Sequence, residues 1–302
     1  MAAPLYVLIP THGRAPLLER TLRSVAGAAR PDGFRGVWVV ENGSPSGADE
    51  VVRRVAAEAP ALGVRYLHHE GANKSAALNS ALAHVEDDDA LLVLLDDDVR
   101  VDPDVLTAYA EAARHSPRAY FGGPVSCDYE EAPPDWLRPS LPHSARGYEL
   151  DDRGVMTDEY LGFNWAAYAR DLEAVGGFDS RVGPGSPTGA RGQETEMQGR
   201  LRAAGVGPVD VPAARVWHYV PKERSSVRWL LRRSKAMGRS VGATESLDQP
   251  DKSVILPILR SSLSLAKRAV LLDRAGAVAA ARGLASALGR LESRRAGVGP
   301  RA

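Results

Sequence analysis

Cysteine is nearly absent from this chain of 302 residues, in which Cys127 is the single example. A lone cysteine excludes an internal disulfide, and no CxxC pair or Cys/His cluster indicates a zinc site. The sequence also lacks a run of about 18 apolar residues, since the segment near Val254 to Leu259 is short and broken by Pro257. No membrane span is therefore expected. The 44% hydrophobic and 25% charged content excludes a collagen-like, disulfide-rich or wholly disordered protein.

The opening residues MAAPLYVLIP are apolar but lack a basic n-region and a cleavage site. They run directly into a polar turn, so we interpret them as a first strand and not as a signal peptide. Together with the single cysteine, this favours a cytoplasmic protein.

The net charge is zero, but the two ends of the chain differ strongly. Residues 221–302 contain 17 Lys and Arg against 6 Asp and Glu, a net charge of +11 that the preceding residues balance. A basic tail suits an anionic membrane surface, an anionic substrate or nucleic acid, and it is equally the pattern of a solvated basic helix face.

Short apolar strands alternate with helical patterns over the first part of the chain. Such alternation is typical of a three-layer α/β/α domain with a mostly parallel sheet. Strands are predicted at 5–9, 36–40, 64–67, 90–95, 119–123 and near 209 and 216, and helices at 16–28, 49–59, 74–85, from 103, 171–175 and 194–204. Loops are expected at 127–157 and 183–192. We predict a domain over residues 1–220 and a basic helical extension over 221–302.

Polar groups follow three of these strands, at Thr11 to Arg14, Glu41 to Ser44 and Asp96 to Asp98. Ligands of open α/β sheets bind beyond the carboxyl ends of the strands, so these groups are candidates for one site. Three adjacent carboxylates repel one another unless a cation or hydrogen-bond donors compensate, and a divalent metal is the simplest remedy. The similar triplet Asp87 to Asp89 precedes its strand and is interpreted as a solvated turn.

Seven segments occur in the order typical of one enzyme family. They are IPTHGRAPLLERTLRSV, VVENGS, NKSAALNSAL, LLDDDVRVDPD, GFNWAAYARDLEAVGGFD, GQETEMQGRL and VWHYVPKER. Over residues 4 to 230 the chain resembles the family 2 glycosyltransferases, which have the GT-A fold. The resemblance implies an inverting, non-processive transferase that uses a nucleotide-sugar donor, a hydroxyl acceptor and Mn²⁺ or Mg²⁺, with no nucleic acid partner.

The resemblance assigns roles to single residues. It implies a donor site in which Pro10, Thr11 and Glu41 border the nucleotide base, Lys74 and Asn79 line the nucleoside pocket, Asp96 holds the ribose, and Asp97 lies in the same acidic motif. Asp98 would coordinate the metal that bridges the diphosphate, with His218 as its second protein ligand; a structural histidine is the alternative. A bridging cation would neutralise the leaving group.

An inverting transfer needs a general base for the acceptor hydroxyl. The family's base is an Asp in an acidic pair, and the match places Glu194 there, one methylene longer. Its alternative role is an N-terminal helix carboxylate favoured by the helix dipole. Glu196 is the second candidate base, although a residue two positions along a helix faces another side.

Further candidates lie nearby. Lys222 and Arg224 could close on the diphosphate from a flexible loop. Trp165, with Asn164, is a candidate to border the donor sugar or acceptor, and core packing is its alternative. Arg228 and Trp229 match the end of the QxxRW motif of processive polymerases, but Ser225 stands at the glutamine position, so a processive synthase is not expected.

Other classes fit less well. A haloacid-dehalogenase-like phosphatase has Thr or Val at the position of Arg100. A Rossmann dehydrogenase has a GxGxxG motif after the first strand, which this sequence lacks. A nucleotidyltransferase opens with a Gly-rich loop, which THGR does not supply. A non-catalytic, glycosyltransferase-like scaffold is the remaining alternative. The sequence departs from the family's pattern at two positions, with Glu41 in place of Asp and Asn73 in place of glycine. Both positions bear on nucleotide identity, for which UDP is the default and dTDP and GDP are alternatives.

The tail has three possible roles. Apolar residues interspersed with Lys and Arg around Val254 to Leu272 could form amphipathic helices that touch an anionic membrane at its inner face. The alternatives are that these helices close the core or pair two subunits of a homo-oligomer.

Overall fold

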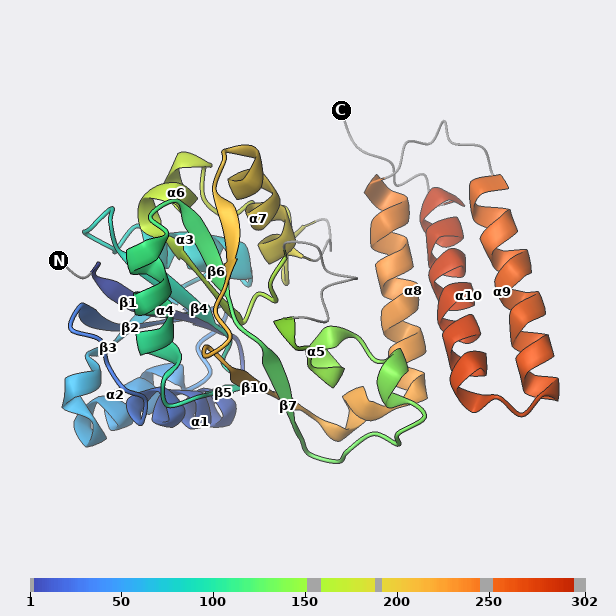
Figure 1. Cartoon of the computed structure of the whole chain (residues 1–302), viewed down its shortest axis with the longest axis horizontal. Helices are drawn as coiled ribbons and strands as arrows, with labels where there is room; N and C mark the ends of the chain where they lie inside the picture. Colours follow the sequence, from blue (N-terminus) through green and yellow to red (C-terminus); the bar gives the residue numbers. More distant parts are fainter. Residues whose placement is uncertain (1–2, 151–158, 188–191, 245–251, 296–302) are drawn as a thin grey trace. The chain divides into compact units, whose positions relative to one another are not determined.

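The computed structural model describes residues 3–150, 159–187, 192–244 and 252–295 (Figure 1). Its strands are β1 (Leu5–Thr11), β2 (Phe34–Asn42), β3 (Val64–His69), β4 (Leu91–Leu95), β5 (Val99–Val101), β6 (Ala119–Gly122), β7 (Val125–Tyr129), β8 (Asn164–Tyr168), β9 (Gly207–Asp210) and β10 (Val216–Val220). Its α-helices are α1 (Ala15–Ala26), α2 (Ala48–Glu58), α3 (Lys74–Leu82), α4 (Val105–His115), α5 (His143–Arg146), α6 (Ala169–Ala174), α7 (Gln193–Ala203), α8 (Val227–Thr244), α9 (Lys252–Val270) and α10 (Arg274–Arg295). Short 3₁₀ turns are η1 (Pro60–Leu62), η2 (Arg138–Ser140) and η4 (Lys222–Ser225).

The central sheet has seven strands in the order β3-β2-β1-β4-β8-β6-β9. The β3-β2, β2-β1, β1-β4 and β6-β9 pairs are parallel, and β8 runs antiparallel to both of its neighbours. The predicted mixed α/β fold with a mostly parallel sheet is thus confirmed. A second sheet, in the order β5-β10-β7, begins directly after the acidic turn that follows β4.

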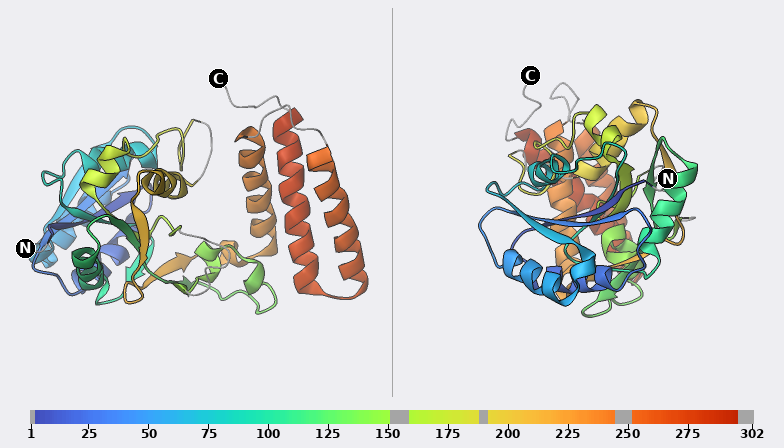
Figure 2. Two further views of the ribbon diagram at one scale, coloured as in Figure 1. Left: turned by 45° about the horizontal axis from the view of Figure 1, so that its top comes forward. Right: turned by 90° about the vertical axis from the view of Figure 1, so that its left-hand side faces the viewer.

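Helices cover both faces of the central sheet (Figure 2). Alternate residues of one strand point to opposite faces. Val93 of β4 accordingly packs in one cluster with residues of α1, α2 and α4, whereas Leu92 and Leu94 pack in another with residues of α3, α6 and α7. Because both faces are covered, all five residues of β4 are buried, as is usual for central parallel strands.

The chain divides into two compact units, residues 1–127 with 147–219, and residues 128–146 with 220–302. The segment 128–146 was predicted to belong to the first domain, but it packs with the C-terminal helices: the Arg282 guanidinium donates to the Ser140 carbonyl at 2.6 Å. The predicted loop over 127–157 contains the end of β7, η2 and α5. Residues 151–157 of this loop lie outside the described part of the chain. Residues 188–191 of the predicted loop over 183–192 also lie outside it.

The second unit contains α8, α9 and α10, with α10 packed against the other two. Glycines let α8 and α10 approach closely. A Cβ at Gly238 would lie 2.0 Å from the Ser286 carbonyl oxygen, and one at Gly289 would lie 2.0 Å from the Lys235 carbonyl oxygen. In the described part of the chain, no helix is long and apolar enough to cross a membrane.

Candidate functional site

The acidic turn Asp96 to Asp98 lies between β4 and β5, at the carboxyl edge of the central sheet. Thr21 of α1 fixes its backbone: the buried hydroxyl shares its one proton between the carbonyls of Asp97 and Val99, at 2.9 and 2.7 Å, and accepts from the Val99 amide at 3.1 Å. The helix that follows β1 therefore holds the turn in place.

Donors from the end of β1 surround Asp97, which is buried. The Thr11 hydroxyl donates to one carboxylate oxygen at 2.7 Å, and the Arg14 guanidinium donates to the other at 3.2 Å. Arg14 also reaches Asp98 at 2.9 Å. Burial and the neighbouring Asp98 charge raise the pKa of Asp97 to about 6, although Thr11 and Arg14 oppose the change. Arg14 thus supplies part of the positive charge that this turn requires.

His218 reaches Asp98 because β10 pairs antiparallel with β5, in a register that places His218 opposite Val99. The Tyr219 amide donates to the Asp98 carbonyl at 2.8 Å. The His218 Nε2 atom lies 3.4 Å from Asp98 Oδ1, and both side chains are 5% exposed. Phe163 stacks on the imidazole, with ring centroids 4.4 Å apart. The two predicted metal ligands are therefore adjacent, and the ring orientation is fixed.

The donor set fits a divalent cation. Carboxylate and imidazole together suit Mn²⁺, and a site of this kind completes its coordination shell with substrate phosphates. Within the described residues His218 Nδ1 is buried without a hydrogen-bond partner, which is unusual for a buried polar atom. No group of three or more His, Cys, Asp and Glu side chains in those residues is arranged to hold a metal alone, so a cation held here would need ligands besides Asp98 and His218.

A second group of charges joins Lys74, Asp96 and Glu194. The Lys74 ammonium lies 2.5 Å from an Asp96 carboxylate oxygen. Burial would lower the pKa of Lys74, but the charges of Asp96 and Glu194 outweigh it and raise the pKa. Burial raises the pKa of Glu194, while Lys74 and a hydrogen bond from the Gly162 backbone oppose the change. Lys74 therefore stays charged between two carboxylates.

Only one of the two candidate bases is held by an arginine. Glu196 binds Arg200 through two hydrogen bonds of 2.6 and 2.7 Å, and Arg200 also donates to the Gly177 carbonyl at 2.8 Å. Glu194 instead lies against Gly162, where an added Cβ would be 3.1 Å from its carboxyl carbon. Glu194 therefore differs from Glu196 in that its pKa responds to burial and to the charges of Lys74 and Asp96, and not to an arginine.

The first turns of α3 are bound to residues 178–184 by a set of hydrogen bonds, here called the α3 clasp. Side chains of Asn73, Ser75 and Asn79 donate to the carbonyls of residues 180, 182 and 178, at 2.7, 2.6 and 2.8 Å. The Lys74 amide donates to the carbonyl of residue 184 at 3.0 Å. Asn79 also accepts from the Phe178 amide at 2.8 Å, so the structure gives this predicted pocket residue a structural task.

Two predicted donor-site residues are closed to a ligand. Trp165 is 1% exposed and packs edge-on against Tyr120 and Phe178, because it lies on the β8 face that α7 covers. Its prediction as a sugar-binding surface is wrong, and core packing explains the residue. Its neighbour Asn164 is equally buried: it accepts from the Tyr109 hydroxyl at 2.7 Å and donates to two backbone carbonyls.

Glu41 is also fully buried. One carboxylate oxygen accepts from the Ser46 amide and hydroxyl, at 2.7 and 2.5 Å, and the other accepts from the Tyr66 hydroxyl at 2.7 Å. Burial raises the pKa of Glu41, but these hydrogen bonds outweigh it and lower the pKa. The carboxylate shapes the turn after β2 and is not presented to a base. Pro10 is buried in β1 beside it.

The remaining candidates lie in the second unit. The Lys222 ammonium forms an ion pair with Glu131 at 2.6 Å, and Arg224 lies in η4 with it. Arg228 and Trp229 begin α8. The structure therefore gives Lys222 an exposed acidic partner, and contact of this loop with a diphosphate stays a prediction.

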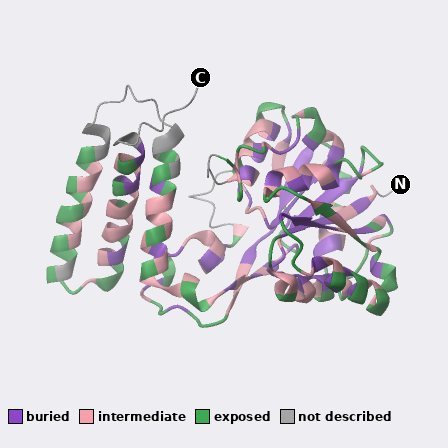
Figure 3. Cartoon of the chain, turned by 180° about the vertical axis from the view of Figure 1, so that it is seen from behind, coloured by how far each residue is buried: buried purple, intermediate pink, exposed green. Residues whose placement is uncertain are grey.

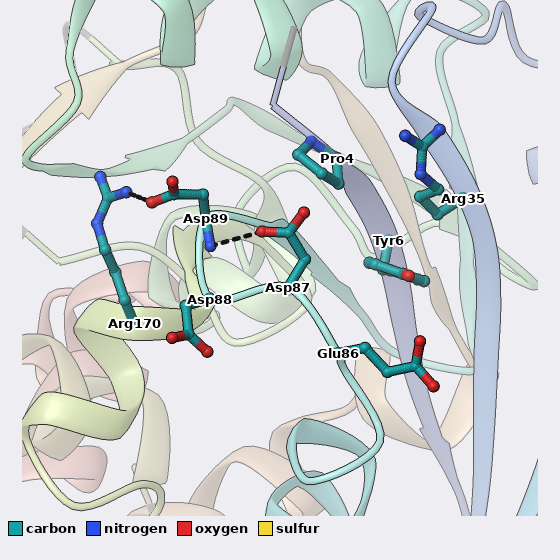
Figure 4. Close-up of a pocket in the computed structure, with 8 residues that line it drawn as sticks. All are labelled: Pro4, Tyr6, Arg35, Glu86, Asp87, Asp88, Asp89 and Arg170. Carbon is teal, nitrogen blue, oxygen red and sulfur yellow. Dashed lines mark hydrogen bonds and ion pairs between the residues drawn. The ribbon is translucent and has the colours of Figure 1, made fainter. Parts of the chain in front are cut away.

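An acidic depression of about 740 Å³ lies at the opposite, amino edge of the sheet (Figure 4). Its wall includes Asp87, Asp88 and Asp89, which are exposed. Asp87 accepts from the Asp89 amide at 3.0 Å, and Asp89 forms an ion pair with Arg170. These contacts make the triplet a solvated turn, as the sequence predicts.

Sequence reasoning gave no role to three groups of the site. Arg14 was noted only within a polar turn, although the unbalanced charge of Asp96 to Asp98 called for a cation. Phe163 and the Gly162 backbone act through contacts that depend on how β8 and β10 approach, and no spacing in the sequence reports this.

Comparison with known proteins settles the family. The model of Glycosyl transferase family 2 matches residues 6–166. This chain belongs to that family. The succinoglycan biosynthesis protein ExoM of Rhizobium meliloti (strain 1021) is 30% identical over 230 residues, which are 76% of this chain and 71% of ExoM. The chain is therefore a glycosyltransferase.

Solved structures support the GT-A fold of this glycosyltransferase. The mannosyltransferase PcManGT from Pyrobaculum calidifontis, in complex with GDP-Man and Mn²⁺, is similar with a TM-score of 0.63 and 23% identity, over 96% of this chain and 88% of that one. GalNAc-T7 with UDP, GalNAc and Mn²⁺ is similar with a TM-score of 0.55 and 15% identity, over 86% of this chain and 51% of that one.

Proposed function

We propose that this glycosyltransferase transfers a sugar, with inversion and with a divalent metal, from a nucleotide sugar to an acceptor hydroxyl. The observation that carries the proposal is the pairing of Asp98 with His218 beside the Lys74, Asp96 and Glu194 group. Two neighbouring folds bind Mn²⁺ with nucleotide ligands, which supports the same class of donor here. UDP is the proposed nucleotide, although the neighbours contain both GDP and UDP.

Asp98 and His218 would hold the cation, which would neutralise the diphosphate of the departing nucleotide. Arg14 would balance the remaining charge of Asp97 and Asp98, so that bound phosphates meet a neutralised turn. Lys74 would hold the Asp96 carboxylate, through their ion pair, oriented toward the ribose. Each of these tasks uses a contact present in the folded chain.

Glu194 would accept the proton of the acceptor hydroxyl as its oxygen attacks the anomeric carbon. A base must be within hydrogen-bond reach of that proton and ionised at the working pH. Burial raises the pKa of Glu194 and so its basicity, while the Lys74 charge limits the rise. Attack from the face opposite the diphosphate gives inversion.

Calorimetric binding of UDP, dTDP and GDP, each with and without Mn²⁺, tests the donor site. We expect one nucleotide to bind only with Mn²⁺, and Asp98→Ala to abolish that binding. Asp88→Ala is the matched control, because Asp88 belongs to the exposed triplet at the other edge. Equal binding by wild type and Asp98→Ala would refute the metal assignment, and metal-independent binding would refute the metal requirement.

A further inference from the structure

Helix α9 exposes a continuous apolar stripe. Leu259, Leu263 and Val270 are 61%, 75% and 83% exposed, and Ile255 and Leu256 are 46% exposed each. Their spacing of three, four and seven residues places them along one side of the helix. The helix packs against α10, while green, exposed residues recur along the length of α9 in Figure 3. The stripe therefore does not close the core, which was one of the roles open to this segment.

The stripe continues into the turn that joins α9 to α10. Leu271 and Leu272 are 64% and 87% exposed, and Leu272 adopts a positive φ of 54°. Single exposed leucines are common, but monomeric proteins rarely expose contiguous apolar patches of this kind, and such patches mark binding surfaces.

The charge beside the stripe is mostly positive, with Asp273 as the acid that lines the same depression. Residues 252–272 contain four Lys and Arg and no Asp or Glu. Arg260 and Lys267 lie beside Leu263 in a shallow depression of about 450 Å³. In the described part of the chain neither cation forms an ion pair, whereas Arg268 is paired with Asp273 at 2.5 Å. The surface thus offers apolar area flanked by unneutralised positive charge.

This combination selects among possible partners. Two copies of α9 face to face would bring Arg260 and Lys267 near the same cations of the other copy, and Asp273 is already paired with Arg268. This repulsion disfavours self-association through this face. An amphipathic helix with Lys and Arg at the border of its apolar face is instead suited to lie in the interface of an anionic membrane. We propose that the α9 stripe and the Leu271–Leu272 turn bind the surface of an anionic lipid bilayer, with the helix parallel to the membrane plane.

Vesicle flotation of the full chain tests the proposal. Vesicles of phosphatidylcholine, with and without phosphatidylglycerol, are compared at low and high salt. We expect flotation with the anionic vesicles and its loss at high salt, because exposed charges are screened. Removing one Lys or Arg near such a surface weakens binding about fivefold, so Arg260→Gln with Lys267→Gln should weaken it about 25-fold.

A second double variant, Leu259→Ser with Leu263→Ser, removes apolar area and should abolish flotation. Matched controls are Arg53→Gln on α2 and Met237→Ser on α8, which change an exposed cation and an exposed apolar side chain elsewhere; both should float as wild type does. Circular dichroism checks that every variant is folded. None of these measurements uses transferase activity, so failure here and failure of the proposed reaction are distinguishable.

Three results would overturn the proposal. The first is no flotation of the wild type with anionic vesicles. The second is binding that the leucine variant retains. The third is a wild-type dimer, seen by sedimentation, that the leucine variant converts to a monomer without any vesicle binding, because the stripe would then serve a second copy of the chain.

Discussion

Replacing Glu194 by Gln isolates the proposed proton transfer from donor binding. Glutamine has nearly the volume of glutamate and retains a carbonyl oxygen for the Gly162 backbone donor, so the side chain keeps its place at the start of α7. What it loses is the ability to accept a proton. The change also removes a negative charge beside Lys74, which still has Asp96 at 2.5 Å.

The expected effect lies in kcat. A positioned general base contributes about 10²- to 10⁴-fold to the rate, equivalent to about 2.7 to 5.4 kcal/mol of transition-state stabilisation. Nucleotide affinity should change little, because the donor diphosphate is assigned to Asp98 and His218. Glu196→Gln is the matched control: it loses an ion pair with Arg200 but no base, so its kcat should stay near that of the wild type.

The assay measures release of the nucleotide diphosphate at saturating donor and acceptor, together with calorimetric nucleotide binding. If Glu194→Gln retained most of the wild-type kcat while Glu196→Gln lost 100-fold or more, on the order of one base contribution, the assignment of the base would be wrong. If Glu194→Gln lost nucleotide binding in parallel with kcat, its role would be structural.

Three further predictions follow from described contacts. His218→Ala should remove Mn²⁺-dependent nucleotide binding as Asp98→Ala does, measured by calorimetry; undiminished binding would show that the histidine is structural. The rate should fall as the pH drops through the raised pKa of Glu194, and in Lys74→Met this acidic limb should move to higher pH, because the cation that lowers the Glu194 pKa is gone; a limb that moved to lower pH would contradict the arrangement. Trp165→Ala should lower the free energy of unfolding by about 3 to 5 kcal/mol, while Trp165→Phe should retain donor binding, and a selective loss of binding in the phenylalanine variant would restore the sugar-stacking role.

Six of the seven strands of the central sheet could be predicted because their signals are local, whereas β8 was not among the predicted strands. Continuous apolar runs such as the one over β4 indicate strands buried on both faces, and their carboxyl ends bring Thr11 and Asp98 to one edge. Strand β5 was missed, since its three residues are too short for periodicity to detect. That strand supplies the pairing with β10 that carries His218 to Asp98.

The errors concern which way a side chain faces. From the sequence alone, a tryptophan beside a glycosyltransferase motif is equally consistent with stacking on a sugar and with packing in the core. The structure places Trp165 in the core because α7 covers that face of β8. Glu41 was likewise expected at the sheet edge and lies there at the end of β2, but the Tyr66 hydroxyl that donates to it comes from a different strand. Segment 128–146 joins the second unit through contacts such as Ser140 with Arg282, which no local pattern contains.

The α3 clasp determines which positions in residues 178–184 can be substituted. Its acceptors in residues 178–184 are alternate backbone carbonyls, which every amino acid provides, so within that segment the clasp constrains chiefly Gly183, whose φ of 111° favours glycine. Asp179 and Arg181 bind each other and could be exchanged together. By contrast Gly185 is fixed, since a Cβ there would lie 1.6 Å from the Ala72 carbonyl oxygen. Positions 179 and 181 could therefore be varied together while the clasp holds Lys74 in place.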